Sequence, residues 1–381
     1  MTSIKKKDIK SWSALMHIID FGPGTKPSMK LLPTANNIIF KQYHPGFEKI
    51  AGREPDSSPE WSLLLSSDDS SKKPFFHNGC TYLPDKDELY IMSDLLQSTS
   101  SSSLPAILIS KVSLRRGPNE AISEVEWVKL RPPSNMPMPA GACRYQNGVL
   151  YCSQGTQVLE SGGLWYMPSG RPPIPFLTSY FHKPFNSIQN VIEDADGGLW
   201  FTDTSIGFEQ EIRPKPELPN QVYRYDPKTE DLRVVADGFV RPTGIALGRP
   251  NVEETTLYIT DTGAVHRNKN NHLPGPATIY AFDVTRKSGS LFATNKRVFA
   301  YAKEGVPTAV VCDDKGNVFA ACGDGVEVWS PGGLALGLIE IPGGCTSLCF
   351  GLPGELFIGA QQRLWRVRLK CMKLLSLKLD T

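Results

Sequence analysis

Uncharged polar side chains recur at the start of short apolar segments along this chain. Asn78, Gln189, Thr243, Thr308 and Thr346 each stand at or just before such a segment. Amide and hydroxyl groups donate and accept hydrogen bonds, so they can orient a bound molecule and polarise a carbonyl or hydroxyl group. They are poorly equipped to activate water, because none of them is a general base at neutral pH. Their chemistry favours the binding and orientation of an uncharged small molecule.

Each of these residues belongs to a cassette in which a polar loop leads to a strand, a tight turn and a second strand. The clearest copy runs from Pro184 to Asp203, where Asp196-Gly197-Gly198 supplies the turn between two alternating segments. Copies recur mostly at intervals of roughly 40 to 65 residues. The six copies begin near Asn78, Ala140, Pro184, Arg241, Val306 and Thr346. An all-β cassette repeated at this spacing predicts a six-bladed β-propeller.

Composition agrees with an all-β fold and excludes some partners. The 381 residues include 33 Gly and 31 Pro, which suits many short strands joined by turns. The net charge of +2 offers no electrostatic case for nucleic acid or an anionic membrane. No apolar run approaches the roughly 20 residues that span a bilayer. The expected partner is therefore a small molecule, and the oligomeric state stays open.

The chain divides into an N-terminal arm with a closing strand (1–70), the rest of a single propeller domain (71–369) and a C-terminal tail (370–381). Within the arm, residues 38–43 form the clearest strand. Propellers commonly close the ring by pairing an N-terminal strand with the last blade. Residues 65–73 are expected to form a polar loop and 98–103 a solvated tip. Loops 205–220 and 265–276, with segment 132–139, are expected to shape an apolar mouth.

The cellular compartment follows from indirect signals. The chain has no Asn-X-Ser/Thr sequon, and the basic start Met1–Asp8 precedes no convincing apolar core of a signal peptide. Its eight cysteines form no CxxC motif, and several lie inside apolar strands as small buried side chains. We expect a reduced, cytoplasmic protein, with secretion as the alternative if a signal peptide has been removed. The disulfide status of the cysteines stays open.

Several longer stretches resemble one known family over roughly residues 38–369. They include Phe185-Asn186-Ser187, Leu199-Trp200-Phe201-Thr202-Asp203 and residues 323–333. The chain resembles the fungal-type lactonohydrolases within the gluconolactonase and regucalcin group of six-bladed propellers. The resemblance implies a central pocket in which a divalent cation, usually Ca²⁺, polarises a lactone carbonyl. It also implies that a Glu, two Asn and an Asp from separate blades bind this cation.

All four of these positions differ in this chain. The resemblance places Asn78 where the family has Glu, Gln189 and Thr243 where it has Asn, and Thr308 where it has Asp. Neutral oxygens alone would compensate poorly for the dehydration of Ca²⁺. We therefore expect neither a metal ion nor a cofactor. The four residues become the candidate catalytic residues, with Asn78 and Gln189 donating hydrogen bonds and the two threonines positioning the substrate.

A second set of residues is expected to bind substrate around this ring. Some of these residues could have a structural role instead of binding substrate. His77 could hydrogen-bond a neighbouring strand, and Arg144 could lie at a blade edge. Asp261, like Asp203, ends a strand and could cap a turn. No Ser-His-Asp order, phosphate loop or dinucleotide fingerprint is present. The set comprises His77, Cys143, Arg144, Asn190, Asp261 and Thr346.

Three functions remain open. The first is a metal-independent enzyme of secondary metabolism that cyclises or isomerises a mostly apolar substrate bearing a carbonyl or hydroxyl, a hetero-Diels–Alder cycloaddition included. The second is a lactone or ester hydrolase of the gluconolactonase type, with displaced carboxylates or a shifted metal. The third is a propeller that binds a ligand without catalysis. Decay of an inactive site would also leave polar residues around a water-filled channel.

Overall fold

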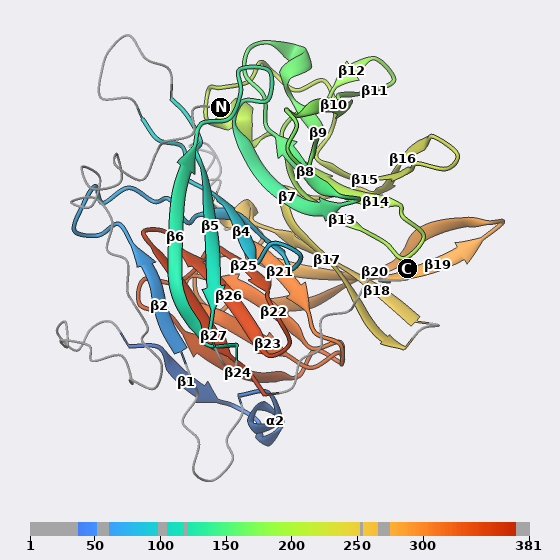
Figure 1. Ribbon diagram of the computed structural model, residues 1–381. Coiled ribbons are helices and arrows are strands. Elements are labelled where there is room, and N and C mark those ends of the chain that lie inside the picture. Colours follow the sequence, from blue (N-terminus) through green and yellow to red (C-terminus); the bar gives the residue numbers. More distant parts are fainter. Residues whose placement is uncertain are drawn as a thin grey trace.

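The computed structural model describes residues 37–51, 61–97, 105–117, 120–251, 254–265 and 275–370. Within these ranges the strands form six principal antiparallel sheets that follow one another around a central axis, so the protein is a six-bladed β-propeller (Figure 1). A two-stranded hairpin, β11 (Ser179–Tyr180) and β12 (Lys183–Pro184), lies between the second and third blades in the chain. The predicted fold class is confirmed.

Each blade is a meander whose first strand is innermost. Blade one consists of β3 (Asn78–Leu83), β4 (Glu88–Met92), β5 (Ile109–Arg116) and β6 (Ile122–Leu130). Blade two consists of β7 (Pro139–Tyr145), β8 (Gly148–Ser153), β9 (Gly163–Pro168) and β10 (Ile174–Leu177). Blade three consists of β13 (Ile188–Glu193), β14 (Leu199–Asp203), β15 (Gln221–Asp226) and β16 (Asp231–Ala236).

The second half of the chain repeats this order. Blade four consists of β17 (Pro242–Asn251), β18 (Glu254–Asp261), β19 (Thr278–Lys287) and β20 (Ser290–Tyr301). Blade five consists of β21 (Ala309–Cys312), β22 (Val318–Cys322), β23 (Gly325–Trp329) and β24 (Ala335–Glu340). Blade six consists of β25 (Ser347–Phe350), β26 (Glu355–Ala360) and β27 (Arg363–Arg368), completed by an N-terminal strand.

The strand that closes the ring is not the one that looked clearest in the sequence. β2 (Trp61–Ser66) pairs with β27 and becomes the outermost strand of blade six. The segment at 38–43 instead contains β1 (Ile39–Gln42), which pairs with β24 as a fifth strand of blade five. Leu65, expected in a polar loop, is fully buried inside β2. An N-terminal strand does close the propeller, but it lies later in the chain than the strand that looked clearest in the sequence.

Turn chemistry fixes the inner hairpins. Between β13 and β14, Gly197 has a φ of +85°, a conformation that favours glycine. The Asp194 carboxylate accepts the backbone N–H groups of Asp196 and Gly198 and the indole N–H of Trp200. Arg224 adds an ion pair of 3.0 Å to the same carboxylate. This hairpin, predicted from Asp-Gly-Gly, is thus held by one buried acid.

Short helices lie in the connections. They are η1 (Pro45–Phe47), α2 (Glu48–Ala51), η3 (Leu159–Ser161), α3 (Ile206–Glu209) and η4 (Gly263–Val265). α3 lies in the predicted loop 205–220. The expected tip at 98–103, most of the insertion at 265–276 and the tail beyond Lys370 lie outside the described residues. No helix in the part of the chain that the structure describes has the length and apolar character needed to cross a membrane.

Apolar side chains fill the spaces between neighbouring blades. The cluster between blades one and six contains Leu64, Phe76, Trp127 and Phe357, each at most 3% exposed. Burying one such side chain stabilises the fold by about 1.5–3 kcal/mol. Because the blades pack on each other around the axis, their first strands leave a central space into which side chains from six separate segments point.

Candidate functional site

A cavity of about 630 Å³ occupies the centre of the propeller. The inner strands of all six blades line it, namely β3, β7, β13, β17, β21 and β25. Its walls carry apolar side chains that include Leu95, Ile107, Ile206, Ile245, Val265 and Val306. A space of this size, largely apolar with a few convergent polar groups, has the character of a small-molecule site.

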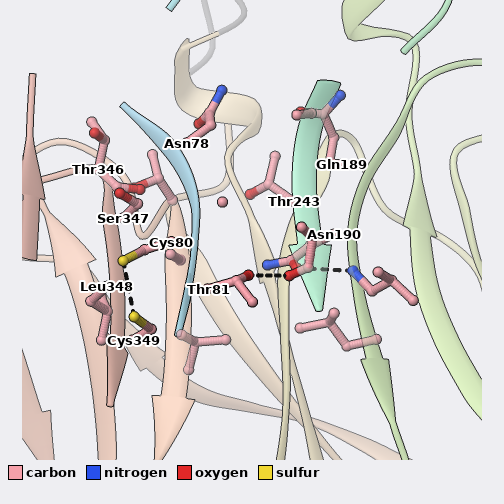
Figure 2. A pocket seen from close by; sticks show the side chains of 18 of the residues that line it. Asn78, Cys80, Thr81, Gln189, Asn190, Thr243, Thr346, Ser347, Leu348 and Cys349 are labelled. Carbon is pink, nitrogen blue, oxygen red and sulfur yellow. Dashed lines mark hydrogen bonds between the residues drawn. The ribbon is translucent and has the colours of Figure 1, made fainter. Parts of the chain in front are cut away.

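The structure brings the predicted ring together. Asn78, Gln189 and Thr243 stand at the first or second position of their inner strands, and Thr308 and Thr346 immediately precede theirs. All five line the cavity. Figure 2 shows Asn78, Gln189, Thr243 and Thr346 at the same level, around one open space. Their common position follows from the cassette, because each polar residue marks the point where an inner strand begins.

Gln189 is held as a hydrogen-bond acceptor. Its Nε2 donates to Gln154 Oε1 at 3.2 Å and to the Ser187 carbonyl at 3.1 Å. The carbonyl cannot donate, so it fixes the orientation of the amide. Figure 2 shows the Gln189 oxygen on the side of the open space. The expectation that Gln189 donates to a substrate therefore needs correction, since both of its N–H groups are engaged by the protein.

The hydroxyl groups of Thr243 and Thr308 also form hydrogen bonds within the protein. Thr243 Oγ1 shares a hydrogen bond of 2.9 Å with Thr260 Oγ1, which also accepts the Gly244 N–H. Thr308 Oγ1 donates to the backbone carbonyl of Thr346 at 2.8 Å and lies 3.2 Å from that of Ala321. Thr308 thereby links the inner edges of blades five and six. Both hydroxyls can still accept a hydrogen bond from a ligand.

Asn78 and Thr346 are the ring members with free hydrogen-bonding groups. Among the described residues the Asn78 side-chain amide bonds to none, and the buried Thr346 Oγ1 has no partner. A buried hydroxyl without a partner costs free energy. The Asn78 amide on blade one is the site's available donor, whereas the Thr346 hydroxyl is enclosed in the wall of blade six.

The loop ahead of Gln189 is held by a second buried acid. Asp203 accepts the backbone N–H groups of Asn186 at 3.0 Å and Ser187 at 2.7 Å. Burial raises the pKa of Asp203 to about 7, against the opposing effect of these N–H groups and of the Arg213 charge. Arg213 donates in turn to the carbonyls of Phe185 and Asn186. Asp203 acts here as a cap that places the loop.

Charged residues at the cavity were missed by the sequence reasoning. Arg241 lines it, and its Nε lies 3.4 Å from Glu209 Oε2 of α3. Burial lowers the pKa of Arg241, opposed by the Glu209 charge. Asp94 and Glu193 also line the cavity, and burial raises the pKa of Glu193. The position of Arg241, two residues before Thr243, could have identified it as a site residue from the sequence. Asp94 follows β4 in no recognisable motif, so no such signal existed for it.

The expected substrate-binding residues divide between the cavity and the scaffold. His77 lines the cavity with Nδ1 2.9 Å from Gln361 Oε1 and Nε2 3.9 Å from Asp94 Oδ1. Cys143 and Asn190 line it as well, and burial raises the pKa of the Cys143 thiol. Arg144 also lines the cavity, with Nη2 2.8 Å from Asp85 Oδ2.

Two expectations do not hold. Asp261 lies outside the cavity lining and is 1% exposed. Its carboxylate accepts the backbone N–H groups of Val240 and Arg241, so it caps the turn ahead of Thr243. Met136 and Met138 pack in the core between blades one and two instead of shaping the mouth. Ile206 and Gln210 of the 205–220 loop do line the cavity, as expected of that loop.

The polar ring does not fit a calcium ion. Ca²⁺ takes six to eight oxygen ligands, with carboxylates to balance its charge. The four ring positions carry neutral side chains, the Thr308 hydroxyl donates to the Thr346 carbonyl, and the Thr243 hydroxyl shares a hydrogen bond with the Thr260 hydroxyl. Across the described ranges, no three His, Cys, Asp or Glu side chains lie close enough to hold a metal ion.

The fold is that of a six-bladed propeller with a cavity on its central axis. Residues 109–361 match the family described as SMP-30/Gluconolactonase/LRE-like region, about two thirds of the chain. The chain belongs to this family.

Individual relatives are more distant. The chain is 29% identical over 256 residues to a gluconolactonase of Zymomonas mobilis, covering 61% of this chain and 66% of that protein. It is 28% identical over 330 residues to the lactonohydrolase oryL of Aspergillus oryzae, covering 81% and 68%. The match thus spans about two thirds of each relative. A solved gluconolactonase of Xanthomonas campestris has the same fold, with a TM-score of 0.63, 22% identity and coverage of 87% and 94%.

Proposed function

We propose that the protein is a metal-independent enzyme that closes a ring in, or isomerises, a largely apolar carbonyl compound held in the central cavity. A hetero-Diels–Alder cycloaddition is one reaction of this type. The observation that carries the proposal is the ring itself. Each position that the family resemblance assigns to a metal ligand holds a neutral hydrogen-bonding side chain that faces the same cavity. The lactonohydrolase and gluconolactonase relatives support catalysis on a small carbonyl substrate.

The roles follow from the hydrogen-bonding state of each side chain. The Asn78 amide donates to the substrate carbonyl oxygen, because it lines the cavity and no partner among the described residues occupies it. Drawing electron density toward this oxygen makes the conjugated carbon atoms more reactive. Gln189 Oε1 accepts a hydrogen bond from a substrate hydroxyl. Donors already aimed at the developing charge need no reorganisation during the reaction.

The apolar walls supply the remaining part of catalysis. Apolar side chains line much of the same cavity and offer water few hydrogen-bonding partners. They include Leu95, Ile107, Ile245 and Val306. Water is not a reactant in ring closure or isomerisation, so these reactions benefit when water is excluded from the cavity. Holding the two reacting carbon atoms within contact distance removes much of the entropic barrier. Precursors of cyclic secondary metabolites are the proposed substrate class.

The experiment is deletion of the gene in its source organism, followed by high-resolution mass spectrometry of the metabolites. Ring closure and isomerisation conserve the molecular formula. The deletion strain should therefore accumulate an isomer of the lost product, and purified protein should convert that isomer in the presence of EDTA. Conversion that EDTA abolishes and Ca²⁺ restores would contradict the proposal.

A second function has one specific observation in its favour. The imidazole of His77 lies 3.9 Å from Asp94 Oδ1, and both residues line the cavity. A histidine beside a carboxylate can serve as a general base for water. This pair would suit the lactone or ester hydrolysis named for the relatives. In that case the deletion strain accumulates a compound that lacks one water relative to the lost product, and His77→Gln abolishes turnover.

A further inference from the structure

Two cysteines from opposite ends of the chain meet in the wall of the central cavity. Cys80 lies on β3 of blade one and Cys349 on β25 of blade six. Their Sγ atoms are 2.9 Å apart, closer than two non-bonded sulfur atoms normally approach. Figure 2 shows the pair one level below Asn78 and Thr346, on adjacent inner strands. Both residues line the cavity, and both carry free thiols.

We propose that Cys80 and Cys349 form a modification site, a dithiol that a small disulfide entering the cavity converts into a covalent bond between the first and last blades. A disulfide needs an S–S distance of about 2.05 Å, so the sulfur atoms must close by roughly 1 Å. The two strands already pack side by side at the seam of the ring. None of the other described cysteine pairs makes a sulfur–sulfur contact.

The two thiols differ in access, which sets the order of events. Cys80 is half-buried and faces the cavity, whereas Cys349 is 8% exposed and packs among apolar side chains. Burial and the neighbouring Cys80 raise the pKa of the Cys349 thiol. The thiolate is the attacking species in disulfide exchange. Cys80 therefore attacks the incoming disulfide, and Cys349 is the resolving thiol.

The chemistry balances with a low-molecular-weight disulfide as the oxidant. Cys80 sulfur attacks one sulfur of R–S–S–R, forms a mixed disulfide and releases R–SH, which carries away the thiol proton. Cys349 sulfur then attacks the Cys80 sulfur, breaks the mixed disulfide and releases the second R–SH. The protein loses two hydrogen atoms and two electrons, and the oxidant gains them. A cavity of about 630 Å³ has room for a small molecule such as 2-hydroxyethyl disulfide.

The bond would act at the contact between blades one and six, which residues 67–77 already connect by running from β2 to β3. Side chains also join the two blades, among them an ion pair of 2.8 Å between Arg116 and Glu355. A disulfide from Cys80 to Cys349 encloses nearly the whole propeller in one loop, and long loops gain most from a cross-link. Asn78, two residues before Cys80 on the same strand, would be fixed with it.

The test treats the purified full chain with 2-hydroxyethyl disulfide and measures intact mass, cross-linked peptides and melting temperature. The expected product has lost two hydrogen atoms, yields a non-reduced peptide pair containing Cys80 and Cys349, and melts about 3–6 °C higher. Dithiothreitol should reverse all three changes. Absence of the Cys80–Cys349 peptide pair at every oxidant concentration would overturn the proposal.

Variants separate the site from general cysteine oxidation. Cys349→Ala should stop at the mixed disulfide on Cys80, with added mass and no rise in melting temperature. Cys80→Ala should react at neither position, which keeps the test valid if Cys349→Ala fails to fold. Cys312→Ala removes another cysteine that lines the cavity and should leave the cross-link intact. A loss of two hydrogen atoms together with a rise in melting temperature in Cys80→Ala would show that another pair of cysteines reacts and would also overturn the proposal. None of these readouts depends on the proposed reaction.

Discussion

At the scale of single residues, two amides at one level of the cavity are held in different states. Both N–H groups of Gln189 are occupied by Gln154 and Ser187. Asn78, across the cavity, has no side-chain partner within the described part of the chain. Although both are uncharged amides, Gln189 can only accept from a ligand while Asn78 can donate. The network around each amide decides its role.

Replacing Asn78 tests the donor role. Asn78→Ala removes a hydrogen bond to the substrate carbonyl that strengthens as negative charge develops on the oxygen. Loss of one such donor costs about 100-fold in kcat. We expect this loss with little change in KM, measured on the isomer that accumulates in the deletion strain.

The matched control is Asn147→Ala. Asn147 is an exposed amide in the β7–β8 turn, where it accepts a hydrogen bond from Tyr166, and it does not line the cavity. This variant should retain the parent's kcat. Equal kcat for Asn78→Ala and the parent would remove Asn78 from the mechanism.

The residue-level part of the site was predicted unevenly from the sequence. The ring positions were found because a cassette repeat places equivalent residues at equivalent points of each blade. Gln154 and Asp94 were not found, because each follows the second strand of its blade and reaches the cavity only through the three-dimensional packing. Asp261 illustrates the opposite case. Its strand-end position matched a site residue and a turn cap equally well, and only the hydrogen bonds distinguish the two.

At the scale of elements, β2 carries the closure of the ring. Its Leu64 is fully buried between blades one and six, whereas Ile39 of β1 is 51% exposed. The sequence pointed to β1 because the apolar residues around its start, Ile38 to Phe40, are β-branched or aromatic, whereas those at 63–65 in β2 are leucines. β2 was less obvious because Ser62 and Ser66 flank its leucines. Burial in the assembled ring, which a local pattern does not report, distinguishes the two strands.

A pair of truncations tests which strand closes the propeller. Leu64→Ala leaves a cavity at the seam and should lower the free energy of unfolding by about 3 kcal/mol. Ile39→Ala, on the exposed edge of blade five, should change it by less than about 0.5 kcal/mol. Chemical denaturation monitored by tryptophan fluorescence measures both. The reverse ranking would show that β1 is the closing element.

The contact between blades one and six should also make the free energy of unfolding depend on pH. Glu355 is buried against Arg116 and Arg366. Burial alone would raise the pKa of Glu355, but hydrogen bonds and charges from the two arginines outweigh it and lower the pKa below 4.5. In the unfolded chain this carboxyl has its ordinary pKa. Its contribution to stability is therefore fully present above pH 4.5 and is lost as the pH falls through the lower, folded-state pKa.

Glu355→Gln tests this dependence. The variant removes the buried carboxylate that contacts both arginines, although Arg116 keeps its ion pair with Asp87, and it should lose about 3 kcal/mol at pH 7. Its unfolding free energy should then fall less steeply than the parent's as the pH is lowered below about 4.5. Urea titrations at a series of pH values provide the comparison. If the unfolding free energies of the two proteins fall in parallel as the pH is lowered, Glu355 does not contribute to the pH dependence of stability.

At the scale of the whole molecule, the fold was predictable and the chemistry was only partly so. Six cassettes with turn residues between alternating segments specify six blades, because a blade cannot bury its faces without neighbours. The central cavity follows from that closure. Its hydrogen-bond network depends on contacts between blades, such as Thr308 with the Thr346 carbonyl, and no single cassette contains both partners.

The central claim is that this cavity retains the family's geometry without its metal-binding chemistry. The most direct measurement is the melting temperature with and without millimolar Ca²⁺, for the parent and for the quadruple variant Asn78→Glu, Gln189→Asn, Thr243→Asn and Thr308→Asp. Two carboxylates facing each other without a cation repel, so the apo variant should melt below the parent. Ca²⁺ that binds only the folded variant should raise its melting temperature. The parent should show no change. A rise for the parent, or none for the variant, would contradict the account.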